Sequence, residues 1–106
     1  MFVNISDLTM QGDADTFLNR ILNEVVPIYE GSQGFIAYYA IKKGDHTVTT
    51  IRVFEDETSF EAAIQNADNA TAQIVTDLGV DPPTQHTNAD VAVASAFGAS
   101  GAIHVP

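Results

Sequence analysis

The stretch FIAYYAIKKGDHTVTTIRVF, from Phe35 to Phe54, decides the fold. Residues 35–42 and 47–54 are rich in aromatic and β-branched side chains, which predicts two strands. The four residues between them (KGDH, 43–46) include Gly and Asp, which are typical of a tight turn. The two strands therefore form a hairpin.

The sequence before this hairpin predicts a strand followed by a helix. Residues 2–8 (FVNISDL) alternate between polar and apolar side chains with a period of two, as a strand does. Residues 13–16 (DADT) place carboxylates at a helix start. Pro27 lies within the helix and is expected to kink it or end it. One apolar stripe of this helix consists of Leu18, Ile21, Leu22, Val25 and Tyr29.

The sequence after the hairpin predicts a second helix and a last strand. Residues 55–59 (EDETS) are acidic and hydroxyl-rich, which suits a helix N-terminus. The helix continues to Leu78, with a break near Asn66 and Asn69, and Gly79 is expected to cap it. After the loop at Pro82-Pro83, residues 90–97 (DVAVASAF) are expected to form the last strand.

The element order is β-α-β-β-α-β, the ferredoxin-like arrangement of the α+β class. It predicts a four-stranded antiparallel sheet with two helices on one face. A chain of 106 residues fits one domain. We assign this domain to residues 1–98, and residues 99–106 form a C-terminal tail.

Two helices cover one face of such a sheet, yet the strands are apolar on both faces. With strict alternation, Phe35, Tyr39 and Ile41 point one way, while Ile36 and Tyr38 point the other. A sheet face exposed to water is normally polar. We therefore expect a second copy of the chain to pair with the open face as a homodimer. The alternative is that the C-terminal tail covers part of it.

Charge and composition exclude several classes of protein. Fourteen acidic residues outnumber four basic ones, for a net charge of −10, which disfavours binding to nucleic acids and anionic membranes. The acidity is equally consistent with adaptation to high salt and with an ordinary acidic protein. The N-terminal residues do not resemble a signal peptide, there is no long apolar run, and there is no Cys, so we expect a cytoplasmic protein.

Five residues are candidates for catalysis. Asn4 faces away from Val3 and Ile5, and its amide could orient a substrate oxygen. Tyr38 and Tyr39 lie on opposite faces of one strand, so one of them should reach a pocket and donate a hydrogen bond. Arg52 lies within a strand and either pairs with a carboxylate or binds an anion. His86 could act as a general base.

Each of these candidates also has a structural interpretation. Asn4 could bond to nearby backbone, the tyrosines could pack in the core, and Arg52 could form an ion pair within or between subunits. His46 lies in a turn and is expected to be solvated, and His104 lies in the tail. The three His residues do not share metal-ligand spacing, so we expect no metal site.

Several stretches resemble the dimeric α/β-barrel superfamily, and specifically its antibiotic-biosynthesis-monooxygenase-like domains. These stretches are Val26-Pro27, Gly34-Phe35, Tyr38-Tyr39, Lys43-Gly44-Asp45, residues 53–57 (VFEDE) and residues 89–93 (ADVAV). In that family two subunits pair their sheets, and each holds a pocket between sheet and helices. The resemblance covers nearly the whole chain.

The resemblance implies a small, largely apolar or aromatic ligand, with Phe35 and Phe54 as further ligand-binding residues. Members of the family include cofactor-free monooxygenases and haem-degrading enzymes. The haem-degrading subgroup pairs an Asn on the first strand with a Trp and a helix His. Asn4 stands at the first of these positions, but Phe54 stands at the Trp position and residues 58–78 contain no His, so we expect no haem chemistry and no cofactor.

Three hypotheses for function follow. The leading one is a cofactor-independent monooxygenase acting on an aromatic or polyketide-like substrate. The second is a non-catalytic binding or stress-associated dimer. The third is an interaction module that uses residues 99–105 as an arm on a partner.

Overall fold

The computed structural model describes residues 1–83 and 85–91. Its sheet contains strands β1 (Phe2–Thr9), β2 (Phe35–Gly44), β3 (Thr47–Phe54) and β4 (Gln85–Asp90). All pairings are antiparallel, and the strand order is β2-β3-β1-β4. The predicted ferredoxin-like fold and the predicted hairpin are both confirmed.

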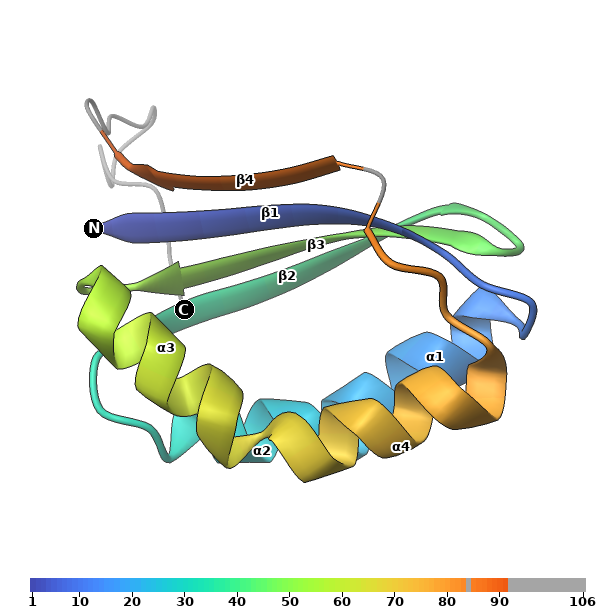
Figure 1. Ribbon diagram of the computed structural model, residues 1–106, viewed down its shortest axis with the longest axis horizontal. Coiled ribbons are helices and arrows are strands. Elements are labelled where there is room, and N and C mark those ends of the chain that lie inside the picture. Colours follow the sequence, from blue (N-terminus) through green and yellow to red (C-terminus); the bar gives the residue numbers. More distant parts are fainter. Residues whose placement is uncertain (84, 92–106) are drawn as a thin grey trace, which may run out of the picture.

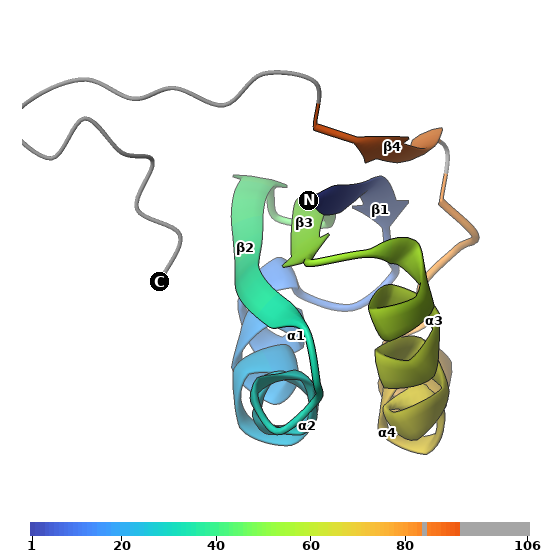
Figure 2. The ribbon, with the colours of Figure 1, turned by 90° about the vertical axis from the view of Figure 1, so that its left-hand side faces the viewer.

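The helical layer lies on one face of the sheet (Figures 1 and 2). It contains α1 (Ala14–Arg20), the π-helical turn η1 (Ile21–Val25), α2 (Val26–Glu30), α3 (Glu57–Asn66) and α4 (Asp68–Leu78). None of the described helices covers the opposite face. In the described part of the chain, no helix is both long and apolar enough to cross a membrane.

Pro27 is accommodated by a π-helical turn. The amide of Val26 donates to the carbonyl of Ile21, five residues earlier, and Pro27 then lies in the first turn of α2. Proline is tolerated there because its missing N–H would have no partner. The π-helical turn is therefore the form that the predicted kink at Pro27 takes.

The π turn also changes which residues face the core. Four residues exceed one α-helical turn of 3.6 residues, so side chains spaced four apart drift around the helix axis. A π turn rotates the chain by a smaller angle per residue and brings side chains at this spacing back onto one face. As a result the buried stripe is Ala14, Phe17, Ile21, Val25 and Tyr29. Leu22, predicted to belong to this stripe, is 61% exposed.

The second helix is broken where its sequence predicts. α3 ends at Asn66, Ala67 takes a non-helical conformation, and α4 begins at Asp68. Gly79 then ends α4 in the left-handed conformation, with φ at +60°. Because glycine adopts this conformation without a steric penalty, the predicted C-cap is confirmed.

A β-bulge corrects the predicted faces of β2. The register with β3 shifts between Phe35 and Ala37, so Ile36 is the extra residue. Phe35 and Tyr38, three positions apart, therefore both pack against Tyr29 on the helix side. Strict alternation, which placed Phe35 with Tyr39, fails at this bulge.

The last strand begins earlier than the sequence predicts. β4 spans Gln85–Asp90 and pairs with β1, whereas residues 90–97 were expected to form the strand. Val91 follows β4 outside any strand, and residues 92–97 lie outside the described residues, as do the tail (99–106) and His104. His86, which the sequence placed before the last strand, therefore lies within it.

Candidate functional site

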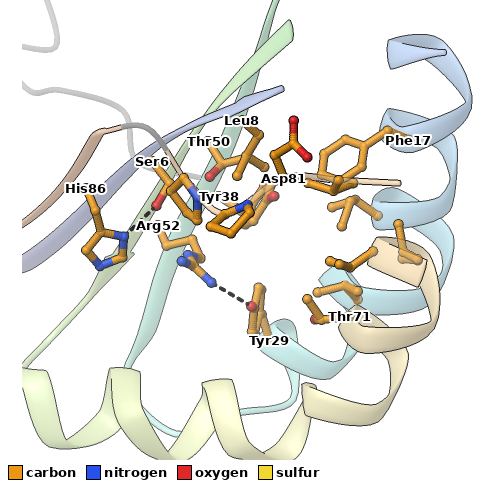
Figure 3. Close-up of a pocket in the computed structure, with 17 residues that line it drawn as sticks. Ser6, Leu8, Phe17, Tyr29, Tyr38, Thr50, Arg52, Thr71, Asp81 and His86 are labelled. Atoms are coloured by element: carbon orange, nitrogen blue, oxygen red, sulfur yellow. Dashed lines mark hydrogen bonds between the residues drawn. The ribbon is translucent and has the colours of Figure 1, made fainter. Parts of the chain in front are cut away.

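A cavity of about 320 Å³ lies between the sheet and the helices (Figure 3). Residues from all four strands form its sheet side, and residues from α1, η1, α2 and α4 form its helix side. The segment after α4, residues 80–83, borders it on a further side. Most of the lining is apolar and includes Leu8, Phe17, Ile21, Val25, Ile74 and Val80. This volume lies at the small end of the range for ligand sites.

Arg52 is the cation that lines this cavity. Its Nε and Nη2 donate to Asn4 Oδ1 at 3.0 and 2.6 Å, and its Nη1 donates to the Tyr29 hydroxyl at 3.2 Å. Its guanidinium carbon lies 5.2 Å from the centre of the Phe60 ring. A guanidinium has five N–H donors, so two remain for a ligand.

No carboxylate of the described residues lies within 4 Å of the Arg52 guanidinium. The other arginine, Arg20, bonds to Glu24 and Asp77, and Lys42 bonds to Asp15. The structural interpretation of Arg52 as half of an ion pair thus finds no partner in the part of the chain that is described. A half-buried cation without a counter-ion favours an anionic group in the adjacent cavity.

Asn4 is fully buried and holds the sheet side of this cluster. It pairs with Arg52 on β3 and with Asn88 on β4, so three adjacent strands place these side chains on one face. Its Nδ2 lies 2.7 Å from Asn88 Oδ1 and 3.0 Å from His86 Nε2. The amide therefore connects the cavity-lining Arg52 to the solvent-exposed edge strand.

Two phenols face the cavity. Tyr29 stacks on Tyr38, with ring centres 5.8 Å apart. Burial raises the pKa of the Tyr38 hydroxyl above its usual range, while the nearby charge of Arg52 acts in the opposite direction. Tyr38 is therefore a neutral hydrogen-bond donor at physiological pH.

Ser6 and His86 complete the polar end of the cavity. Ser6 is buried, and its Oγ lies 3.1 Å from His86 Nδ1 and 3.4 Å from Asn4 Oδ1. Both residues line the cavity, and Figure 3 shows them next to Arg52. Asp81 contributes a carboxylate to the lining, and it is exposed to solvent.

The structure brings four of the predicted catalytic residues to one end of the cavity: Asn4, Arg52 and His86 form a hydrogen-bonded cluster, and Tyr38 stacks on Tyr29 beside it. Tyr38, Arg52 and His86 line the cavity, and Asn4 lies directly behind Arg52. Tyr39 belongs to the opposite sheet face, because it pairs with Ile51 and Ile5 follows in the same row.

Phe35 and Phe54, expected to bind ligand, do not line this cavity. The Phe54 ring is fully buried and packs edge-on against Phe35 and Phe60, with centres 5.5 and 5.7 Å apart. Both residues are part of the core that supports Tyr29. Both residues lie near the bulge and away from the cavity, which explains why they do not line it as expected.

Sequence reasoning missed Ser6 and Tyr29 as site residues. Ser6 follows Asn4 by two positions, so the same alternation places both on one face. Tyr29 was assigned to the helix stripe, but its hydroxyl points at Arg52. His46 is exposed, as expected, and its Nδ1 bonds to the carbonyl of Gly12 at 2.7 Å. The described residues contain no cluster of three metal-ligating side chains.

Comparison with known proteins supports the fold assignment. No family model and no curated protein matches the sequence. Among solved structures, SnoaB from Streptomyces nogalater, a cofactor-independent oxygenase, is similar over 85% of this chain and 91% of its own, with 16% identity and a TM-score of 0.69.

Two further structures show the same similarity. The monooxygenase from the gene ActVA-Orf6 of Streptomyces coelicolor, solved with nanaomycin D, matches over 92% of each chain at 17% identity and a TM-score of 0.70. A putative antibiotic biosynthesis monooxygenase from Chloroflexus aurantiacus matches over 92% of this chain and 98% of its own, also at 17% and 0.70. The chain thus has the fold of antibiotic-biosynthesis-monooxygenase-like proteins, as its sequence motifs suggest.

Proposed function

We propose that this protein is a homodimer that binds a small aromatic, polyketide-like anion in the cavity of each subunit and oxidises it without a cofactor. The observation that carries this proposal is Arg52, which lines a mostly apolar cavity and has no carboxylate partner among the described residues. The two oxygenases with the same fold support the choice of reaction.

The proposed reaction needs an activated substrate carbon and molecular oxygen. A hydroxyanthrone loses a proton from its central CH₂ group to give an anion whose charge is shared with its oxygen. The carbanion reacts with O₂, so that the CH₂ becomes C=O with one oxygen atom and the other leaves as water. The substrate supplies all the electrons, so no cofactor is required.

The residues at the polar end would stabilise this anion. Arg52 would donate to the anionic oxygen, Tyr38 would provide a neutral hydroxyl, and Asn4 would hold Arg52 in place. Donors that are already fixed in a mostly apolar cavity stabilise developing charge strongly. His86 is exposed at the same end, so the cavity borders solvent there and the released proton can pass directly to water.

Oxygen uptake with a panel of hydroxyanthrones and phenols tests the proposal. We expect oxygen consumption and quinone formation above background, and Arg52→Gln should lower kcat/KM by about 100-fold or more. Arg20→Gln is the matched control, because Arg20 is bonded to Glu24 and Asp77 on the surface, and it should retain activity. Uptake at background across the panel would remove the oxygenase from the proposal.

A second candidate is a binding protein without turnover. It is favoured by the scarcity of acid–base groups, because Asp81 is the one carboxylate among the residues that line the cavity and it is exposed. This candidate predicts ligand retention without oxygen uptake. Native mass spectrometry of freshly purified protein would show the retained mass.

The open sheet face supports the homodimer. Two adjacent rows across it contain Ala37, Val53 and Val3, then Tyr39, Ile51 and Ile5, and neither row has a charged side chain. On a chain with a net charge of −10, these two uncharged apolar rows are suited to self-association, and Asp7 lies in the row next to them. A cytoplasmic location remains part of the proposal.

A further inference from the structure

The Ser6 hydroxyl lines the cavity next to His86, and the direction of its proton can be deduced from its neighbours. We propose that Ser6 is a second hydrogen-bond donor to the anionic oxygen of the ligand, and that His86 supports it as a neutral donor instead of acting as a base. This inference rests on the proposed function in one respect, namely that the cavity binds an aromatic anion. It follows from the hydrogen-bond directions at Asn4, His86 and Ser6, which are deduced in that order from the contacts of Arg52.

The first step fixes the amide of Asn4. A guanidinium has donors and no acceptor, so the atom that lies 2.6 Å from Arg52 Nη2 and 3.0 Å from Nε must be the Asn4 oxygen. The Nδ2 group of Asn4 therefore points toward β4. Both of its hydrogens have a partner there, at Asn88 and at His86.

The second step fixes the tautomer of His86. The Asn88 atom 2.7 Å from Asn4 Nδ2 must be its oxygen, which leaves Asn88 Nδ2 facing His86 Nε2 at 3.0 Å. Nε2 of His86 thus meets two amide donors and has to accept. In the neutral imidazole the proton is then on Nδ1.

The opposite tautomer conflicts with these contacts. A proton on Nε2 would face the donors of both Asn4 and Asn88. Rotating the Asn88 amide would relieve one contact but place its Nδ2 against Asn4 Nδ2. Asn4 itself cannot rotate without turning its own N–H groups toward Arg52.

The third step sets the direction of the Ser6 hydroxyl. His86 Nδ1–H donates to Ser6 Oγ at 3.1 Å, so the Ser6 proton must point elsewhere. Within the described residues its partner is Asn4 Oδ1 at 3.4 Å, which is long for an O–H···O bond and already accepts from Arg52. A ligand oxygen in the cavity can therefore take this proton at little cost.

The consequence is a polar end that presents donors to the cavity. Arg52 offers two N–H groups, Ser6 offers its O–H, and Tyr38 is neutral and can donate. Such a set selects an oxygen that carries negative charge and has no hydrogen of its own. A phenolate, an enolate or a carboxylate satisfies this condition, whereas the methyl ether of the same phenol does not.

The tautomer is tested directly by ¹⁵N NMR of the His side chains in the unliganded protein. We expect His86 to carry its proton on Nδ1. His46 is an internal reference, because its Nδ1 must donate to the Gly12 carbonyl, and His86→Gln assigns the signals. Asn4→Asp, which replaces the amide donor by an acceptor, should move the His86 proton to Nε2. A His86 proton on Nε2 in the wild type would overturn the proposal.

Binding measurements test the role of Ser6. The probe is the monoanion of 1,8-dihydroxyanthraquinone, at a pH above its first phenolic pKa, with its dimethyl ether as the uncharged comparison. Ser6→Ala should weaken binding of the anion roughly tenfold and leave binding of the ether unchanged. Ser32→Ala is the matched control, because its hydroxyl donates to the Ile28 carbonyl, and it should match the wild type.

These outcomes separate the inference from the proposed function. If the wild type binds the anion and Ser6→Ala binds it equally well, the role of Ser6 is wrong and the proposed function stands. If the wild type binds none of the anions, the proposed function fails, and the role of Ser6 fails with it.

Discussion

Burial raises the pKa of the Tyr38 hydroxyl, and the charge of Arg52 offsets part of that rise. A phenol whose pKa is raised stays neutral over the range in which a free phenol, with a pKa of about 10, begins to ionise. The stability that the folded protein gains by burying the neutral Tyr38 hydroxyl is fully present below the pKa of a free phenol, about 10. This stability is lost as the pH rises above that value, because the unfolded chain then releases the Tyr38 proton more readily than the folded protein does.

The tyrosinate absorbance of the protein during an alkaline titration measures this shift. The difference between the wild type and Tyr38→Phe isolates one phenol. We expect this difference to develop above the pH at which N-acetyltyrosinamide ionises. A difference curve that coincides with that of the free phenol would show that Tyr38 is not desolvated in the cavity.

Candidate residues on the first and third strands could be predicted because a period of two reliably shows which sheet face a side chain points to. Asn4 was selected on that basis and Arg52 as an arginine within a strand, and the register places them opposite each other. Ser6 was missed because a serine in a strand carries no distinctive signal. Its importance depends on His86, and the strand that positions His86 was predicted in the wrong place.

The turn between α2 and β2 contains two glycines with different constraints. Gly34 has φ at +81°, and a Cβ at this position would lie 2.5 Å from Ser59 Oγ. Gly31 has φ at −82°, and its added Cβ would meet only the carbonyl oxygens of Pro27 and Ile28, at 3.6 and 3.7 Å. One glycine is required by its conformation, and the other is not.

Urea unfolding of two alanine variants tests this difference. Gly34→Ala should cost more than about 1 kcal/mol, because it strains the backbone and crowds Ser59. Gly31→Ala is the matched control and should be neutral or stabilise the protein by up to about 1 kcal/mol. Equal unfolding midpoints for the two variants would contradict the described geometry of this turn.

Elements with local signals were predicted well, and elements set by tertiary pairing were not. The hairpin, the break at Ala67 and the cap at Gly79 depend on turn residues and capping, which the sequence displays. The bulge at Ile36 and the position of β4 depend on pairing with other strands. Five of residues 85–90 (QHTNAD) are polar, so no apolar pattern marks them as a strand.

At the scale of the whole molecule, the open sheet face leads to a prediction about assembly. Ile5 is 38% exposed and lies in the row with Ile51 and Tyr39. A carboxylate at this position would be buried without a partner in a face-to-face dimer. Sedimentation equilibrium should therefore give a dimer for the wild type and a monomer for Ile5→Glu.

Leu22→Glu provides the matched control for this experiment. Leu22 is also an exposed apolar residue, at 61%, but it lies on the helical layer. This variant should remain a dimer. A wild-type monomer, or an Ile5→Glu variant that still dimerises, would contradict pairing through the sheet face.

The central claim is that the cavity between sheet and helices binds a small aromatic anion. Its most direct test is the stoichiometry with which the 1,8-dihydroxyanthraquinone monoanion, at a pH above its first phenolic pKa, binds to the wild type, Val75→Trp and Leu22→Trp in isothermal titration calorimetry. Val75 lines the cavity and is 36% exposed, so a Trp there can fold while filling the entrance. We predict one ligand per chain for the wild type and Leu22→Trp, and none for Val75→Trp. Equal binding by all three proteins, or no binding by the wild type, would contradict the claim.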